Sequence, residues 1–322
     1  ISIDDRTIKE GDLYVAIKGD KYDGHNFINS AITKGASGVI VSDKKLALRI
    51  SGLLVKDTKV ALKNIAQFSR NRFTGKVIAI TGSSGKTSTK HILATSLQEF
   101  DKTHFTQGNN NNIIGLSLTL SRLPKDYAFC VLELGMNHTG EIKELTLISK
   151  PHIALITNVS SSHIENFKSE KEIANAKSEI FIGLNANGVA IINSDNTWCD
   201  YLKEKAKKYT TNIKLYGHTI KSSQRINKII DEKDGSTIFL ENNRPWSEEK
   251  ATSSAMEMYD LMWNMKFLPP GRGLWAMGAP VTRERQNYMA LQNCAFHSTK
   301  DISKNPSEPF EFMMDVSMLG VG

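Results

Sequence analysis

The stretch Val77-Ile-Ala-Ile-Thr-Gly-Ser-Ser-Gly-Lys-Thr-Ser88 joins a short apolar run to a loop that contains two glycines. The residues expected to bind phosphate are Gly82, Ser83, Ser84, Gly85, Lys86, Thr87 and Ser88. Glycine lets such a loop curl until its backbone N–H groups point at phosphate oxygens, and a helix that begins near Lys86 adds the positive end of its dipole. Lys86 would reach the β- and γ-phosphates, and the Thr87 hydroxyl would bind Mg²⁺. The stretch therefore predicts an ATP-binding domain that uses magnesium.

This loop is a short variant of the general phosphate-loop pattern, because Ile80 stands where that pattern has its first glycine. The shorter form is T-G-x-x-G-K-[ST]. A bare G-K-T also occurs in ordinary glycine turns. The apolar strand before the loop and the helix expected after it favour nucleotide binding over such a turn.

Apolar runs and helical segments alternate through most of the chain. Besides the run before the loop, the expected strands are Leu13–Ile17, Gly38–Ser42, Tyr127–Leu134, Ile153–Asn158, Gly188–Asn193 and Ile213–Tyr216. The expected helices are Asn26–Lys34, Lys59–Phe73, Lys86–Phe100, Gly140–Ser149, Glu170–Leu184 and Asn196–Tyr209. This alternation predicts an α/β fold with a mostly parallel sheet, and it places ligands at the carboxyl ends of the strands.

Three reactive side chains lie at or near these strand ends. Glu133 ends an apolar strand, where a carboxylate can hold Mg²⁺ directly or through water, although a surface glutamate is an equal alternative. His163 lies in the loop after the strand Ile153–Asn158, and alone it would be a solvated loop histidine. Lys177 lies on an amphipathic helix, where an exposed lysine is the ordinary alternative.

A polar segment, Thr106-Gln-Gly-Asn-Asn-Asn-Asn-Ile-Ile-Gly115, reads as a loop rather than a core element. Its four asparagines offer donors and acceptors to a sugar or a peptide amide. A plain asparagine-rich loop is the alternative.

The composition narrows the class of protein. The 322 residues, 40% of them hydrophobic, suit two or three domains, and no apolar run approaches the roughly 20 residues of a membrane span. The formal charge of +7 comes from lysines scattered among acidic residues, so it does not predict nucleic-acid binding. Cys130, Cys199 and Cys294 form no C-x-x-C pair, which favours a reducing, cytoplasmic location. The oligomeric state is not determined by the sequence.

The composition changes abruptly near Asn243. Residues 1–243 contain thirty isoleucines and one methionine, whereas residues 244–322 contain one isoleucine and nine methionines. A Met-rich subdomain would explain the methionines but not the loss of isoleucine. The seam therefore favours two segments of different origin.

Residues 1–242 resemble the Mur ligase family. The motifs that carry the resemblance are T-G-S-S-G-K-T-S (81–88), G-N-N-N-N-I-I-G (108–115), L-E-L-G-M-N (132–137), I-T-N-V-S-S-S-H-I-E-N-F (156–167) and I-A-N-A-K-S-E-I-F (173–181). The opening, with Asp4-Asp-Arg6 and Gly11-Asp-Leu-Tyr-Val-Ala-Ile-Lys-Gly19, is most similar to the branch that adds D-alanyl-D-alanine. The resemblance implies ATP-dependent amide-bond formation in peptidoglycan precursor synthesis, with a UDP-muramoyl-peptide and D-Ala-D-Ala as small-molecule substrates.

The resemblance also implies three domains and a role for each site residue. Residues 1–74 would bind the UDP substrate, residues 75–242 would bind ATP, and residues 243–322 would form no complete domain. The implied catalytic residues are Lys86, His163 and Lys177, the last as a carbamate; the implied Mg²⁺ residues are Thr87, Glu133 and His163; the implied substrate residues are Asp4, Arg6, Asn111, Asn112 and Gly115. Asp5 stands where the family has a small hydroxyl residue, and its carboxylate should repel a diphosphate.

The segment after the seam resembles the N-terminal part of an adenosylcobalamin-dependent ribonucleotide reductase. The resemblance rests on residues 258–278, 291–296 and 309–320, and Cys294 is similar to a redox-active cysteine of that family. A third Mur domain is expected in this region instead, so impaired ligation is expected, and the segment is expected to be mainly helical or irregular. A reductase fragment and a non-catalytic nucleotide-binding protein remain the alternative functions.

Overall fold

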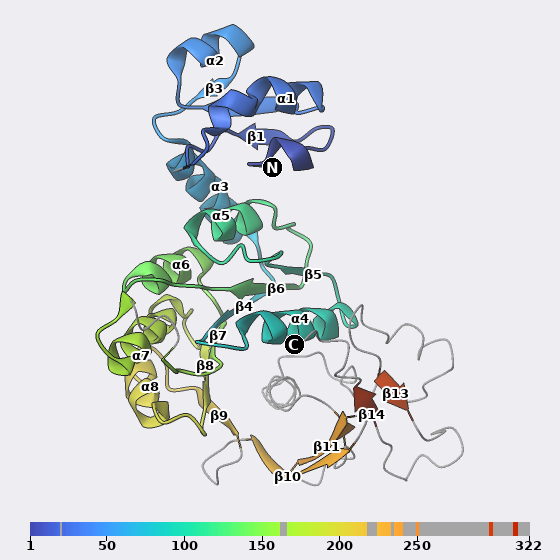
Figure 1. Ribbon diagram of the computed structural model, residues 1–322, viewed down its shortest axis with the longest axis vertical. Coiled ribbons are helices and arrows are strands. Elements are labelled where there is room, and N and C mark those ends of the chain that lie inside the picture. The colour runs from blue at the N-terminus through green and yellow to red at the C-terminus, as the bar shows by residue number, and fades with distance from the viewer. Residues whose placement is uncertain are drawn as a thin grey trace.

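The computed structural model describes residues 1–19, 21–161 and 166–217, together with the backbone of five later strands at 224–232, 235–240, 249–250, 296–298 and 312–314. Two sheets organise these residues, a small one at the N-terminus and a large one behind it (Figure 1). The α/β class with mostly parallel strands is confirmed.

The small sheet is parallel and has the strand order β1-β2-β3. Its strands are β1 (Leu13–Val15), β2 (Gly38–Val41) and β3 (Leu53–Leu54), and its helices are the 3-10 turns η1 (Asp5–Thr7) and η2 (Gly24–Phe27) and the α-helices α1 (Ile28–Thr33) and α2 (Lys44–Ile50). Tyr14 and Val39 are buried against Ile28 and Ala31 of α1. Helices that follow strands β1 and β2 supply the crossovers which a parallel sheet requires.

The large sheet has a parallel half with the order β9-β8-β7-β4-β6-β5. Its strands are β4 (Lys76–Thr81), β5 (Thr103–Phe105), β6 (Phe129–Glu133), β7 (Ile153–Ile156), β8 (Val189–Asn193) and β9 (Ile213–Gly217). Ile80 pairs with Glu133, and Thr81 pairs with Ile156, so β4, β6 and β7 end at the same level. The last residues of these three strands therefore share one edge of the sheet.

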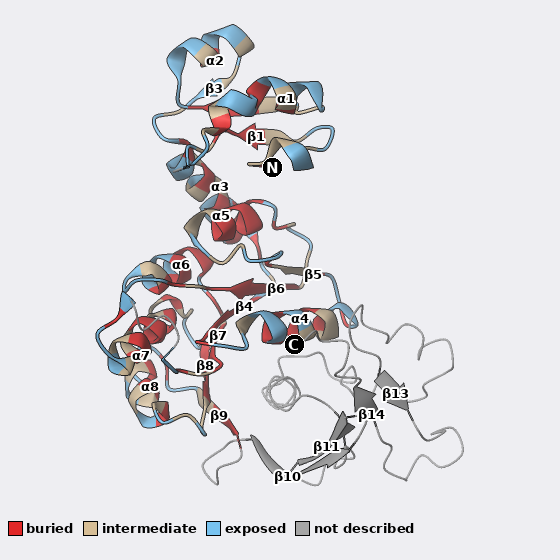
Figure 2. Cartoon of the chain, viewed as in Figure 1, coloured by how far each residue is buried: buried red, intermediate tan, exposed pale blue. Residues whose placement is uncertain are grey.

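Side chains of β4 alternate between two cores, one on each face of the sheet. Ile78 and Ile80 pack with Leu93 and Leu97 of α4 (Lys86–Gln98), whereas Val77 and Ala79 belong to the core on the opposite face. The helices of that opposite face are α3 (Thr58–Arg72), α5 (Ile113–Ser121), α6 (Glu141–Ser149), α7 (Glu170–Ser178), the 3-10 turn η4 (Glu179–Gly183) and α8 (Cys199–Ala206). Figure 2 shows the sheet buried between these layers, as expected for a mostly parallel sheet.

Helix α3 connects the two sheets. Leu62 packs with Val15 and Ile40 of the small sheet, while Ala66 belongs to the core of the large one. The Arg70 guanidinium donates to the backbone carbonyls of Ser149 and Lys150 at the end of α6. A boundary at residue 74 remains a prediction, and α3 contacts both of the parts that this boundary would separate.

The remaining described strands extend the large sheet beyond β9. They are β10 (Gln224–Glu232), β11 (Gly235–Leu240), β12 (Glu249–Lys250), β13 (Phe296–Ser298) and β14 (Phe312–Met314). β10 pairs parallel with β9 and antiparallel with β11. Only the last three of these strands fall within residues 243–322; the other residues of that segment, including Cys294, lie outside the described residues.

Several elements differ from the sequence expectation. The helix expected over Glu170–Leu184 is α7 followed by the 3-10 turn η4. Strands β3 and β5 and helices α2 and α5 were not predicted. The Asn-rich loop was expected to extend to Gly115, but α5 already begins at Ile113.

Candidate functional site

The phosphate loop connects the end of β4 to the first turn of α4. Gly85 has a φ of +78°, a left-handed conformation that favours glycine, and it directly precedes the first residue of α4. A Cβ atom at Gly82 would collide with the Thr157 hydroxyl. Both glycines of the motif are therefore required by the backbone or its neighbours, as the sequence predicted.

Residues that follow β7 fix the conformation of this loop. The Thr157 hydroxyl donates to the Ser84 carbonyl at 2.6 Å. Asn158 accepts from the Ser84 N–H at 2.9 Å through its side-chain oxygen, and its amide nitrogen donates to the Ser84 hydroxyl at 2.6 Å. The Ser83 hydroxyl accepts from the Ser160 N–H at 2.9 Å. The loop is thus preorganised by hydrogen bonds from a second segment.

Lys86 folds back over the loop. Its Nζ donates to the carbonyl of Gly82 at 2.8 Å. Burial lowers the pKa of this ammonium group, and the negative charge of Glu133 opposes the shift. Lys86 is thus held within reach of any phosphate that the loop binds.

Glu133 is the carboxylate at the centre of the site. Its Oε1 accepts from the Thr87 hydroxyl at 3.2 Å and from the Asn111 amide at 3.0 Å. Its Oε2 lies 3.2 Å from the Nζ of Lys90, and the side chains of Glu133 and Lys90 are 1% and 0% exposed. The structure thus places Glu133, Thr87 and Asn111 together, as the sequence predicted, and adds Lys90.

Thr87 and Glu133 fit a magnesium site. Oε2 of Glu133 is buried and has no hydrogen-bond partner among the described residues, although Lys90 is near enough for an ion pair. A buried oxygen without a hydrogen bond costs free energy unless a cation or water binds it. Mg²⁺ commonly takes one or two protein oxygens and completes its shell with water and phosphate. No cluster of three or more His, Cys, Asp or Glu side chains that suits a metal occurs in the described part of the chain.

Lys177 is a buried lysine near the same loop. The residue is 2% exposed, and it has no hydrogen-bond or ion-pair partner among the described residues. Burial lowers its pKa from 10.5 to about 7, with a smaller contribution from the charge of Lys86. A neutral amine is therefore well populated at neutral pH, and the neutral form is the one that reacts with electrophiles.

The chain matches two family profiles. "Mur ligase middle domain" matches residues 80–259, more than half of the chain, and "Mur ligase family, catalytic domain" matches residues 1–71. The chain belongs to the Mur ligase family. The match to the middle domain continues past the change in composition at Asn243.

Curated relatives of this Mur ligase chain share one name, UDP-N-acetylmuramoyl-tripeptide–D-alanyl-D-alanine ligase. The protein from Rickettsia prowazekii is 41% identical over 233 residues, 70% of this chain and 51% of the relative. The protein from Escherichia coli is 42% identical over 202 residues, 62% of this chain and 44% of the relative. The chain spans about half the length of the curated relatives it matches.

Solved structures with the same fold include two proteins named MurF. The Thermotoga maritima protein, solved in complex with ADP, superposes with a TM-score of 0.71 at 27% identity, covering 82% of this chain and 62% of that one. The Acinetobacter baumannii protein superposes with a TM-score of 0.70 at 28% identity, covering 88% and 60%.

Two residues of the predicted substrate loop have structural contacts in this Mur ligase. The Asn112 side chain accepts from the Gly115 N–H at 2.9 Å and caps α5. A Cβ atom at Gly115 would collide with the backbone of Asn110. Both residues thus shape the loop that carries Asn111, and their contact with substrate stays a prediction.

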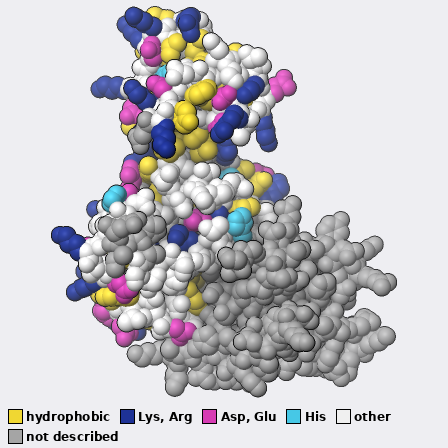
Figure 3. Space-filling view, viewed as in Figure 1, with side chains coloured by type: hydrophobic (Ala, Val, Ile, Leu, Met, Phe, Trp, Pro, Cys, Tyr) yellow, Lys and Arg dark blue, Asp and Glu magenta, His cyan; other side chains and the backbone are white. Residues whose placement is uncertain are grey.

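The N-terminal candidates form a separate group. Asp4 accepts from Arg6 through Nε at 2.9 Å and Nη2 at 2.7 Å. Asp5 accepts from the Ser30 hydroxyl at 2.6 Å and pairs with Lys34 at 3.1 Å. The carboxylate expected to repel a diphosphate is thus bound to its own neighbours. Figure 3 shows Lys and Arg side chains of this part interspersed with Asp and Glu.

Sequence reasoning missed Lys90, Thr157 and Asn158, and it also named a residue that cannot be placed. His163 lies outside the described residues, so its predicted role near the metal stays a prediction. Thr157 and Asn158 lay inside a quoted motif, where their position directly after β7 was the available signal. Lys90 lies one helical turn beyond Lys86, which was also a usable signal.

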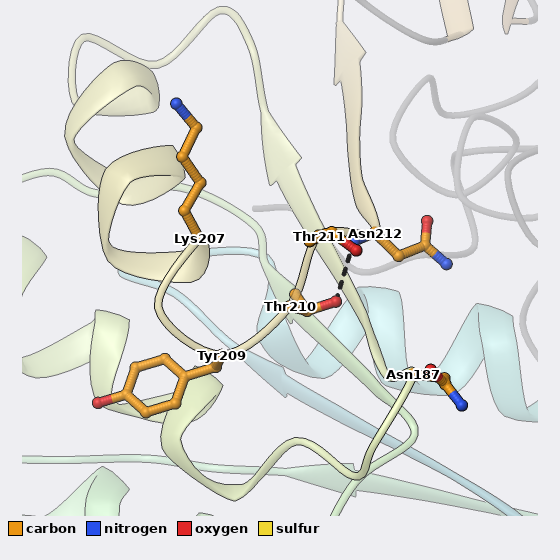
Figure 4. Close-up of a pocket in the computed structure, with 6 residues that line it drawn as sticks. All are labelled: Asn187, Lys207, Tyr209, Thr210, Thr211 and Asn212. Carbon is orange, nitrogen blue, oxygen red and sulfur yellow. Dashed lines mark hydrogen bonds between the residues drawn. The ribbon is translucent and has the colours of Figure 1, made fainter.

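A hollow of about 390 Å³ lies away from the phosphate loop. Its lining residues are Asn187, Lys207, Tyr209, Thr210, Thr211 and Asn212, shown in Figure 4. They precede β8 and β9, so they lie at the amino edge of the parallel strands, whereas the phosphate loop lies at the carboxyl edge. Parallel α/β sheets bind ligands at the carboxyl edge, and we assign no function to this hollow. No helix among the described residues has the length and apolar character needed to cross a membrane.

Proposed function

We propose that this chain carries the ATP-binding and substrate-binding parts of a ligase that joins D-alanyl-D-alanine to UDP-N-acetylmuramoyl-tripeptide. The observation that carries the proposal is the cluster at the carboxyl edge, where the phosphate loop, Glu133 and Asn111 are in contact. Relatives about 40% identical bear the name of this activity. The proposed location is the cytoplasm, consistent with Cys130 and Cys199, which are buried and free.

The reaction proposed is a two-step acyl transfer. A carboxylate oxygen of the tripeptide attacks the γ-phosphorus of ATP, which forms an acyl phosphate and releases ADP. The amine of D-Ala-D-Ala then attacks the acyl carbon. The C–N bond forms, the C–O bond to phosphate breaks, and the amine proton leaves to solvent with release of inorganic phosphate.

The phosphate loop and Lys86 would stabilise the negative charge of this reaction. Backbone N–H groups and the Lys86 ammonium are donors fixed in place before substrate arrives, which is the arrangement that lowers a barrier most effectively. Thr87 and Glu133 would hold Mg²⁺, which when bound neutralises phosphate charge. His163 is kept as a proposed further residue of this metal environment.

Lys177 is proposed to act as a carbamate. Its neutral amine adds to CO₂ with loss of a proton, and the product carries a negative charge that helps to position Mg²⁺. The low pKa of about 7 supports this role because the neutral amine is available at physiological pH. The resemblance to the family suggested this modification, and the burial of Lys177 supports it.

The substrate contacts are proposed at two places. Asp4 and Arg6 would lie near the uridine diphosphate. Asn111, Asn112 and Gly115 belong to the loop that meets Glu133, where the reacting carboxylate would arrive. The contact between Asn111 and Glu133 supports this placement because it joins the loop to the metal carboxylate.

The test is phosphate release by the chain with UDP-N-acetylmuramoyl-tripeptide, D-Ala-D-Ala, ATP and Mg²⁺, with the ligated product identified by mass spectrometry. We expect Lys86→Ala to lower the rate at least about 100-fold. Lys102→Ala is the matched control, because Lys102 forms an exposed pair with Asp126. A wild-type chain that binds ATP but releases no phosphate and forms no product would instead be a non-catalytic nucleotide-binding protein.

A second proposal concerns the segment after Asn243. We infer from the change in composition and the ribonucleotide-reductase resemblance that residues 244–322 have a different origin from the residues before them. Sequencing the native gene across Leu240–Trp246 tests this inference. A native reading frame without the junction would support it, and a native transcript that contains the junction would contradict an artefactual fusion.

A further inference from the structure

Lys90 lies on the face of α4 that carries the phosphate-loop residues. It follows Lys86 by four positions and Thr87 by three, and residues at these spacings share one helix face. Its side chain is 0% exposed. A fully buried lysine is rare in proteins unless a partner compensates its charge.

The partners of Lys90 are the metal carboxylate and the substrate loop. Its Nζ lies 3.2 Å from Oε2 of Glu133 and donates to the Gly108 carbonyl at 3.0 Å. Glu133 receives its other contacts at Oε1, from Thr87 and Asn111. Lys90 thus lies beside the one carboxylate oxygen that is left without a hydrogen bond.

The charges around Glu133 do not favour a free divalent cation. Glu133 supplies one negative charge, while Lys90 lies next to it and Lys86 is close enough to interact with it electrostatically. Without phosphate, these three side chains sum to about +1, and buried charges interact strongly because water screens them poorly. ATP brings several negative charges and reverses this balance.

We propose that Lys90 is a positioning residue that acts as the counter-ion of Glu133, so that a divalent cation enters the site with the nucleotide and not before it. In the absence of nucleotide, Lys90 holds the carboxylate and fixes the Gly108 carbonyl of the adjoining loop. When a metal nucleotide binds, Oε2 becomes a cation ligand, and Lys90 remains within reach of Gly108. The inference rests on the proposed function only for the nucleotide that accompanies the metal.

The test is a titration with Mn²⁺ alone, followed by electron paramagnetic resonance of the free ion, on the full chain. We expect the wild-type chain to bind Mn²⁺ weakly without nucleotide and Lys90→Gln to bind it at least about 10-fold more tightly, because the competing positive charge is gone. Lys90→Arg keeps the charge and should resemble the wild type. Circular dichroism checks that each variant is folded.

Three outcomes would overturn the proposal. Tight binding of Mn²⁺ to the wild-type chain without nucleotide contradicts it before any variant is made, and this result does not depend on whether Lys90→Gln folds. A folded Lys90→Gln with unchanged Mn²⁺ binding shows a purely structural ion pair. A gain in Lys90→Arg equal to that in Lys90→Gln shows that charge is not the cause.

Binding of a fluorescent ATP analogue, measured in parallel, separates this proposal from the ligase assignment. Absent binding of the analogue with Mg²⁺ present would contradict the nucleotide site itself. Normal binding of the analogue without ligation would contradict only the ligase reaction. The effect of Lys90 on Mn²⁺ alone can be supported or overturned in either case.

Discussion

The two edges of the central sheet treat charge in opposite ways. At the carboxyl edge, Lys90, Glu133 and Lys177 are each no more than 2% exposed. At the amino edge, Lys207 is exposed and pairs with Glu204 on the surface at 2.6 Å. Both edges are polar, but only one removes charged groups from water. Burying a charge costs several kcal/mol before compensation, so its persistence at one edge marks the place where chemistry requires it.

Lys177→Met should give the largest effect, because it removes both a buried charge and a proposed catalytic group. The folded pKa of about 7 lies below the model value of 10.5, so the unfolded chain binds more protons between these values and stability should rise with pH across that window. The variant should lose this dependence, gain about 2 kcal/mol of stability near pH 7, and lose ligation at least about 100-fold.

The measurement is thermal unfolding of wild type and variant from pH 7 to 10 in buffer free of CO₂, combined with phosphate release. Lys102→Met serves as the control, since Lys102 is exposed beside Asp126. Equal pH dependence in the wild type and Lys177→Met would show that Lys177 is not desolvated in the native state.

Gly82→Ala should give an intermediate effect. The added methyl group would meet the Thr157 hydroxyl, so the loop must shift away from the segment that fixes it. We expect about 1–3 kcal/mol of destabilisation from this overpacking and about 10-fold weaker binding of an ATP analogue. Chemical denaturation and equilibrium fluorescence measure the two quantities.

Gly140→Ala is the control for Gly82→Ala. Gly140 has a φ of +94° with nothing within 4 Å of its Cβ position, so alanine there strains the backbone without a collision. It should lower stability by about 1 kcal/mol and leave nucleotide binding unchanged. Equal losses of affinity in both variants would attribute the effect to general instability.

Lys207→Ala should give the smallest effect. Its pair with Glu204 is exposed, and such pairs contribute about 0–1 kcal/mol. We expect unchanged phosphate release and a change in stability within about 0.5 kcal/mol. A substantial loss of activity would mean that the hollow at the amino edge takes part in function, and the contrast between the edges would fail.

The parallel sheet and the phosphate loop were predictable because their patterns are local. The run that ends at Thr81, the glycines after it and the helix from Lys86 each follow from residue types within a few positions. Grouping Glu133 with Thr87 followed from the rule that parallel strands place their carboxyl ends at one edge. The strand order, by contrast, depends on long-range packing that no local pattern encodes.

Helix α5 and Lys90 show why the rest was not predictable. Every residue of α5 from Gly115 to Ser121 is buried, so the helix lacks the polar stripe that marks an amphipathic helix. Its apolar and hydroxyl residues alternate as a strand would, which gives the wrong period. Lys90 was missed because a helical lysine is normally exposed, and its partner Glu133 lies 43 positions away in the sequence.

Helix α3 determines the distance and rotational phase between the two sheets. Its 15 residues span about 22 Å, and each residue turns the helix by about 100°. Leu62 and Ala66 therefore contact their respective cores only at one helix length. A single inserted residue between them would swing the Arg70 side chain away from the carbonyls at the end of α6. Changes of chain length are therefore tolerated in the surface loops of this protein, but not within this spacer.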